Sequence, residues 1–104
     1  MNNVLITGFT GQVGSQLADY ILENTDDHVI GMMRWQESMD NIYHLTDRIN
    51  KKDRISIQYA DLNDLMSLYN LIDTVRPKFI FHLAAQSFRV LHLIFQLKRF
   101  KQIL

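Results

Sequence analysis

Residues 4–14 read VLITGFTGQVG, in which a short apolar run is followed by glycines at positions 8, 11 and 14 and then by a stretch with helical periodicity. A strand that leads through a glycine loop into a helix is typical of the phosphate-binding turn of dinucleotide-binding proteins. Gly8 would adopt a backbone conformation that side chains disfavour, Gly11 would let the main chain approach a pyrophosphate, and Gly14 would let the helix lie close to the sheet. The first-turn amides would then face the phosphates. The alternative is a plain tight turn.

Beyond this stretch the chain alternates between predicted helices and strands. Apolar spacing predicts helices over 11–24, over 41–50 and from Asp61 to the residue before Pro77, and further strands over 28–33, 55–59 and 79–83. This pattern predicts an α/β fold: a Rossmann-type parallel sheet of about four strands in the order 3-2-1-4, with helices on both faces. A ligand would bind where the order switches, between the carboxyl ends of the first and fourth strands. The first helix is expected to bury Val13, Leu17, Ile21 and Leu22, and residues 51–54 to form a solvated turn.

Composition narrows the class of protein. The 104 residues form one domain at most, and a formal net charge of zero does not indicate a nucleic-acid partner or an anionic membrane. The sequence has no cysteine, and no set of histidines and carboxylates has the spacing of metal ligands. No apolar run approaches the roughly 20 residues that cross a bilayer. The N-terminus enters a strand directly, without the features of a secretory leader. We therefore expect a cytoplasmic protein.

The residue after the second strand bears on the choice of dinucleotide. Dinucleotide folds that prefer NAD usually carry an acidic residue there, which accepts the ribose 2′-hydroxyl, whereas an arginine suits the 2′-phosphate of NADP. This chain has Arg34, and its nearest acidic residue, Glu37, lies three positions further on. The residues therefore favour NADP over NAD. The alternative is a solvent-exposed loop arginine.

Three other residues have both a functional and a structural interpretation. The Asp61 carboxylate could accept from an adenine amino group beside the Leu62 backbone, or Asp61 could be the N-cap of the following helix. His82 lies within an apolar strand, where a hydrogen-bonded core residue is a more common role than a ligand or base. Trp35 could shield the adenine end of a cofactor, or it could cover the core.

Four segments together resemble the extended short-chain dehydrogenase/reductase family (NAD-dependent epimerases and dehydratases): residues 4–14, Arg34, Ala-Asp-Leu at 60–62, and His-Leu-Ala-Ala-Gln-Ser at 82–87. Within that family they are most similar to the NADP-dependent GDP-mannose 4,6-dehydratase branch. The resemblance covers about residues 3–87. Val13 departs from it, since those dehydratases often carry aspartate there, and this leaves a related nucleotide-sugar epimerase or reductase open.

The resemblance implies a cofactor site. The glycine loop would hold the pyrophosphate, Arg34 the 2′-phosphate, and Asp61 with Leu62 the adenine, while the segment after the fourth strand would line the ribose and nicotinamide. The implied cofactor-binding residues are Gly8, Thr10, Gly11, Gln12, Val13, Gly14, Arg34, Asp61, Leu62, Leu83, Ala84, Ala85 and Ser87.

The resemblance also implies a reaction on a sugar nucleotide. Family members oxidise the sugar C4 hydroxyl, eliminate water across C5–C6 and return the hydride to C6, using a Tyr-x-x-x-Lys pair and a Ser or Thr downstream of the similar region. None of the tyrosines at 20, 43, 59 and 69 is followed four residues later by lysine. We therefore predict no catalytic residue in this chain, and an NADP-binding half-domain over 1–87 that is inactive alone. A non-enzymatic NADP-binding or interaction module is the alternative from another class.

Residues 88–104 depart from the family pattern. They contain Arg89, Lys98, Arg99 and Lys101 and no acidic residue. A one-nucleotide shift of a back-translated 90–104 permits LTFDIPIETLQTNI, similar to the helix expected there, so we interpret this basic tail as a frameshift product; the codon choices are ours, and sequencing the locus tests it. The alternative is an amphipathic helix that covers the fourth strand or meets a partner or anionic membrane surface. Without following strands, the fourth strand would form a sheet edge, and we expect self-association through that edge or the tail.

Overall fold

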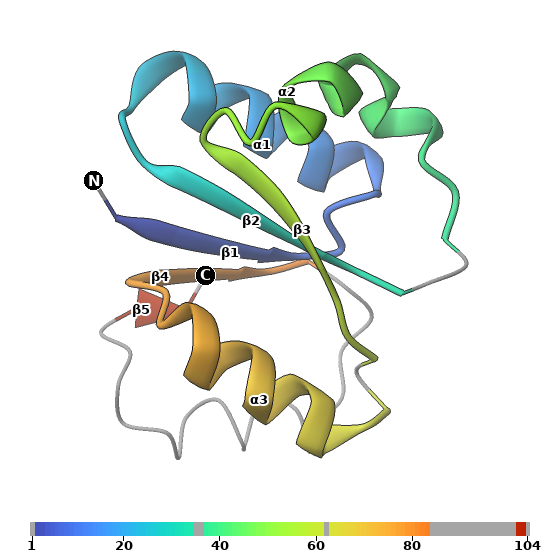
Figure 1. Cartoon of the computed structure of the whole chain (residues 1–104), viewed down its shortest axis with the longest axis vertical. Helices are drawn as coiled ribbons and strands as arrows, with labels where there is room; N and C mark the ends of the chain where they lie inside the picture. Colours follow the sequence, from blue (N-terminus) through green and yellow to red (C-terminus); the bar gives the residue numbers. More distant parts are fainter. Residues whose placement is uncertain (1, 35–36, 62, 84–101, 104) are drawn as a thin grey trace.

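The computed structural model describes residues 2–34, 37–61, 63–83 and 102–103 (Figure 1). Its parallel sheet has the order β3-β2-β1-β4-β5, and these described residues confirm the predicted α/β fold and the 3-2-1-4 order of the first four strands. The strands are β1 (Asn3–Thr7), β2 (His28–Met33), β3 (Ile55–Tyr59), β4 (Phe79–His82) and β5 (Gln102–Ile103). The helices are α1 (Gln12–Asn24), the 3-10 helix η1 (Asp40–Leu45), α2 (Thr46–Asn50) and α3 (Leu65–Val75).

The sheet separates two apolar cores. Figure 1 shows α1, η1 and α2 on one face of the sheet and α3 on the other. Because successive side chains of a strand point to opposite faces, Val4 and Ile6 of β1 pack with the α1 layer while Leu5 packs with α3. Both faces of the central strands are therefore covered, which explains why they are apolar at nearly every position.

The inward face of α1 differs from the predicted one at its first residue. Ala18, Ile21 and Leu22 are buried, whereas the side chain of Val13 is 64% exposed, so the prediction for Val13 is wrong. At 3.6 residues per turn, Val13 lies roughly 140° around the helix from Ala18 and so faces solvent. Leu17 is partly buried against the core, as expected.

Helix α3 begins later than predicted. Asp64 is its N-cap, since the carboxylate accepts from the backbone amides of Met66 and Ser67 at 3.2 and 3.3 Å. Asp61 is therefore not the cap; its carboxylate accepts instead from the amide of Asn63 at 2.9 Å, in the turn before the helix. The helix ends at Val75, because Pro77 disfavours right-handed helix in Arg76, which takes a left-handed conformation with φ 49°.

The charged turn before β3 is more than a solvated corner. The Arg54 guanidinium donates to the carbonyl oxygens of Leu22, Thr25 and Asp27 at the end of α1. Cations favour the carbonyl end of a helix, where the last carbonyls lack partners in the helix itself. The prediction for Arg54 is thus wrong, and this arginine ties α1 to the start of β3.

The helix predicted over 41–50 consists of two shorter helices. It is split into η1 and α2, although Ile42 and Leu45 are buried as expected.

The fourth strand has a neighbour on its outer side. The prediction that β4 forms the sheet edge is wrong at Phe79 and Ile80, because β5 pairs with them in parallel. Gln102 and Ile103 are in this strand, so the helical alternative for the tail is wrong for these two residues. The frameshift and the self-association stay predictions, and 84–101 lies outside the described residues. In the described ranges, no helix has both the length and the apolar content to cross a bilayer.

Candidate functional site

The glycine loop closes tightly between β1 and α1. Gly8 has φ 71°, a left-handed conformation that disfavours side chains, and its carbonyl accepts from the amide of Gly11 at 3.0 Å. A Cβ on Gly14 would overlap the carbonyl oxygen and carbon of Gly8, and one on Gly11 would lie 3.3 Å from the same oxygen. The start of α1 can therefore lie against the end of β1 only if position 14 has no side chain.

The amino end of α1 is open. Its N-cap, Gly11, supplies no side-chain acceptor, and the first turn contains no acidic residue. Gln12 and Val13 follow Gly11 in the first turn and are both exposed, and amides of a first turn have no acceptor within the helix. An uncapped amino end combines free N–H donors with the positive end of the helix dipole, and this arrangement can bind a phosphate.

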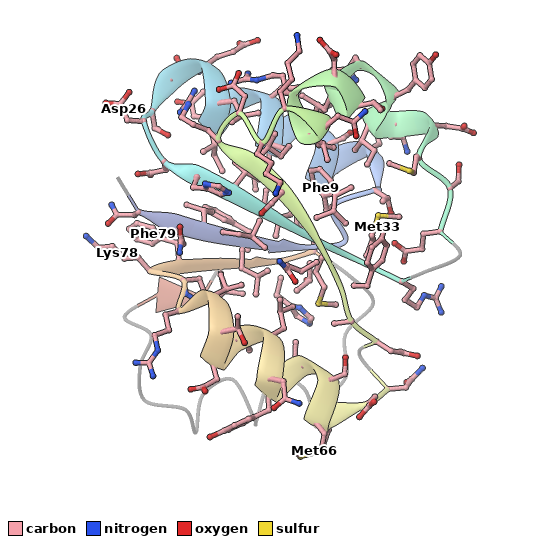
Figure 2. The ribbon with its side chains drawn as sticks, in the orientation of Figure 1. Phe9, Asp26, Met33, Met66, Lys78 and Phe79 are labelled. Atoms are coloured by element: carbon pink, nitrogen blue, oxygen red, sulfur yellow. The ribbon has the colours of Figure 1, made fainter. Side chains whose placement is uncertain are left out.

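Phe9, which the sequence analysis did not single out, anchors this loop. Its side chain is fully buried in the core that contains Val4 and Ile6, and Figure 2 shows it between the sheet and the helices above it. A Cβ on Gly31 in the middle of β2 would overlap the Phe9 ring, so the ring occupies the space that this glycine leaves. A glycine within an otherwise apolar strand often marks such a close approach, so Gly31 was the feature of the sequence that could have indicated this contact.

A carboxylate joins the glycine loop to Arg34. Thr10 Oγ1 donates to Glu37 Oε2 at 3.0 Å, and Arg34 Nε donates to Glu37 Oε1 at 3.4 Å. Asn41 Nδ2 donates to the carbonyl oxygen of Thr10 at 2.9 Å. The structure thus joins Arg34 to one predicted loop residue, Thr10, through Glu37, while 63% of the Arg34 side chain remains exposed.

The carboxyl ends of β1 and β4 lie side by side, as the strand order predicts. The amide of Leu83 donates to the carbonyl oxygen of Thr7 at 3.2 Å. Thr7 Oγ1 and His82 Nδ1 lie 2.7 Å apart in the interior, and His82 is 5% exposed, which confirms its interpretation as a hydrogen-bonded core residue. The other ring nitrogen, Nε2, is buried and has no hydrogen-bond partner among the residues that the structure describes.

Burial lowers the pKa of His82 below its ordinary value, and burial together with the nearby Arg54 charge lowers the pKa of His28. The unfolded chain therefore takes up these protons near pH 6.5, whereas the folded chain takes them up only at lower pH. We expect the free energy of unfolding, measured with urea, to be constant above about pH 7 and to fall below pH 6.5, by at most about 1.4 kcal/mol per pH unit for each histidine.

The double variant His28→Gln, His82→Gln is the control for this pH dependence. It is expected to flatten the decrease between pH 6.5 and 5, whatever its own stability at pH 7. An equally steep decrease in the double variant would show that other groups cause it.

The remaining predicted site residues are more dispersed. Asp61 follows Ala60, whose amide donates to the carbonyl oxygen of Met33 at 3.1 Å, so it lies near the end of β2 rather than beside the glycine loop. Leu62, Ala84, Ala85 and Ser87, as well as Trp35, lie outside the described residues. Within the described ranges, no group of three histidine or carboxylate side chains is arranged to hold a metal ion.

Most of the chain matches a known protein family. The family model described as GDP-mannose 4,6 dehydratase matches residues 5–92. The chain belongs to the GDP-mannose 4,6-dehydratase family. The GDP-mannose 4,6 dehydratase of Drosophila melanogaster is 40% identical over 87 residues, which are 80% of this chain and 22% of that enzyme. The chain spans about a fifth to a quarter of the curated relatives it matches, since the share for the human enzyme is 24%.

Solved structures show the same fold. Bordetella bronchiseptica WbmH in complex with NAD+ superimposes with a TM-score of 0.62 at 25% identity, over 85% of this chain and 27% of WbmH. dTDP-glucose 4,6-dehydratase of Bacillus anthracis in complex with NAD gives a TM-score of 0.76 at 17% identity, over 99% of this chain and 36% of that enzyme. These two structures therefore show that the chain shares a Rossmann-type fold with them.

Proposed function

We propose that this chain is the NADP-binding portion of a nucleotide-sugar dehydratase of the GDP-mannose 4,6-dehydratase type, with the half-domain covering residues 1–87. The observation that carries the proposal is the contact between Gly14 and Gly8, which only glycine permits and which leaves an uncapped helix end at the loop. WbmH, whose fold this chain shares, is a protein in complex with NAD+, which supports a dinucleotide as the ligand.

Successive segments of the chain are assigned to successive parts of the dinucleotide. The pyrophosphate is held by the loop, the adenosine 2′-phosphate by Arg34, and the adenine near Asp61. Leu83 lies beside Thr7 at the carboxyl ends of β4 and β1. Leu83 and the residues that follow it are therefore assigned to the ribose and nicotinamide. When bound, the dinucleotide supplies hydride acceptance and return, and this chain's residues bind and orient it.

The proposal assigns no acid–base step to these residues. The given sequence contains no Tyr-x-x-x-Lys pair, so the sugar nucleotide and the proton-transferring groups belong to the remainder of a full-length enzyme. Mixing this chain with a separately expressed C-terminal portion of a relative and assaying GDP-mannose turnover tests this division. Restored turnover supports it, whereas a non-enzymatic binding module would bind dinucleotide and restore nothing.

Direct titration tests the cofactor. We expect calorimetric titration to show binding of NADP+, and Arg34→Ala to weaken that binding about tenfold, the equivalent of 1.4 kcal/mol for a partly exposed charge-assisted contact. The effect of Arg34→Ala on NAD+ affinity should be less than about threefold, because NAD+ has no 2′-phosphate.

Arg48→Ala is the matched control for this titration, since it removes the same charge on α2 and is expected to leave both affinities unchanged. Equal losses for NADP+ and NAD+ in Arg34→Ala would contradict the assignment of the 2′-phosphate to Arg34. Failure of both dinucleotides to bind the unchanged chain would overturn the proposed function itself.

A further inference from the structure

Glu37 lies between the two groups that the proposed function assigns to phosphates. One carboxylate oxygen accepts from Thr10 in the glycine loop at 3.0 Å, and the other accepts from Arg34 at 3.4 Å. The side chain is 26% exposed, so it is neither in bulk solvent nor withdrawn into the core. The amide of Glu37 also donates to the carbonyl oxygen of Arg34 at 3.2 Å, so these two residues are joined through the main chain as well as through their side chains.

We propose that Glu37 is a specificity-determining residue, which sets how strongly this site prefers a dinucleotide with a 2′-phosphate over one with a 2′-hydroxyl. The inference rests on the proposed function. The Nε–H that Arg34 donates to the Glu37 carboxylate is not available to a 2′-phosphate at the same time, so a phosphate is left with the Nη donors of the guanidinium.

Charge adds to this competition. A carboxylate next to a 2′-phosphate is a like-charge pair, which weakens the binding of NADP, whereas a 2′-hydroxyl can donate to a carboxylate. The chain therefore carries at one site both an arginine that favours NADP and an acidic residue that disfavours it. Its preference for NADP is thus smaller than Arg34 alone would produce.

The contact with Thr10 gives Glu37 a second role in the loop. Thr10 is held from two directions, by the Glu37 carboxylate through its hydroxyl and by Asn41 through its carbonyl oxygen. Glutamine at position 37 retains an oxygen that can accept from Thr10, and it removes only the charge. Glu37→Gln therefore separates the effect on specificity from the effect on the loop.

The test compares NADP+ and NAD+ affinities of the full chain by calorimetry. We expect Glu37→Gln to raise the affinity for NADP+ about tenfold and to change that for NAD+ by less than about threefold. Glu37→Ser also removes the charge and replaces the glutamine variant if that variant folds poorly. We expect it to shift the ratio of NADP+ to NAD+ affinity in the same direction. Glu23→Gln changes the net charge equally at an exposed position near the end of α1, and it should leave both affinities unchanged.

Two outcomes separate this inference from the proposed function. If the unchanged chain binds both dinucleotides and Glu37→Gln alters the ratio of affinities by less than twofold, the role of Glu37 is overturned and the proposed function stands. If the unchanged chain binds neither dinucleotide, both are overturned.

Discussion

Replacing Gly14 with alanine is expected to destabilise the chain by about 2–3 kcal/mol and to reduce NADP+ affinity about a hundredfold or more. In an ordinary helix the same change stabilises by up to about 1 kcal/mol, because alanine is the better helix former. Here the new methyl group would overlap backbone atoms of Gly8, which cannot rotate away as a side chain could. The loop must move, so the amides of the first turn no longer point at one phosphate. Two charge-assisted hydrogen bonds are worth about 3–6 kcal/mol, and losing part of this weakens binding by the expected factor.

Urea unfolding and calorimetric titration of the same preparation measure the two effects together. Gln16→Ala is the control, since position 16 is exposed on the same helix and should gain a few tenths of a kcal/mol or nothing. A Gly14→Ala variant that is more stable than the unchanged chain would mean that α1 does not lie against Gly8. The assignment of the pyrophosphate to the glycine loop would then be wrong.

The fold could be predicted because its determinants are local. Apolar periodicity identified strands β1 to β4 and the two long helices, α1 and α3. The rule that crossovers are right-handed then led to the predicted strand order. The end of α3 was also readable, because Pro77 acts on the residue immediately before it. Where two local signals competed, the result was less certain: Asp61 and Asp64 can both cap a helix, and the turn after β3 uses Asp61 in a different hydrogen bond.

The site was predicted in part, for a related reason. The glycines and Arg34 are recognisable from spacing alone, but the contacts that join separate loops and strands form between residues far apart in sequence. Glu37 contacts Thr10 across 27 positions, and Arg54 contacts carbonyl oxygens in and just after the end of α1 across 27 to 32 positions. Such contacts depend on where the sheet places the loops, which no short window of sequence contains. The network around Arg34 was therefore invisible until the strands were placed in space.

The buried contact between Phe9 and Gly31 has the second large expected effect. Phe9→Ala should cost about 3–5 kcal/mol, the usual range for deleting a buried aromatic ring. Gly31→Ala alone should cost about 2–3 kcal/mol, because its methyl group would overlap the ring. In the Phe9→Ala background the same methyl group enters the space that the ring has left, so the Gly31→Ala step should cost less than about 1 kcal/mol.

A double-mutant cycle of urea unfolding measures this coupling, which we expect to be about 2 kcal/mol. Phe79→Ala is the comparison for ring size, since Phe79 is only partly buried against the same core and should cost less than Phe9→Ala. Because the loop that carries Gly8 and Thr10 begins at this anchor, Phe9→Ala should also weaken NADP+ binding about tenfold while the chain is still folded. If Gly31→Ala costs the same with and without the Phe9 ring, the ring does not occupy that space, and the loop must be held in place by the Thr10 contacts alone.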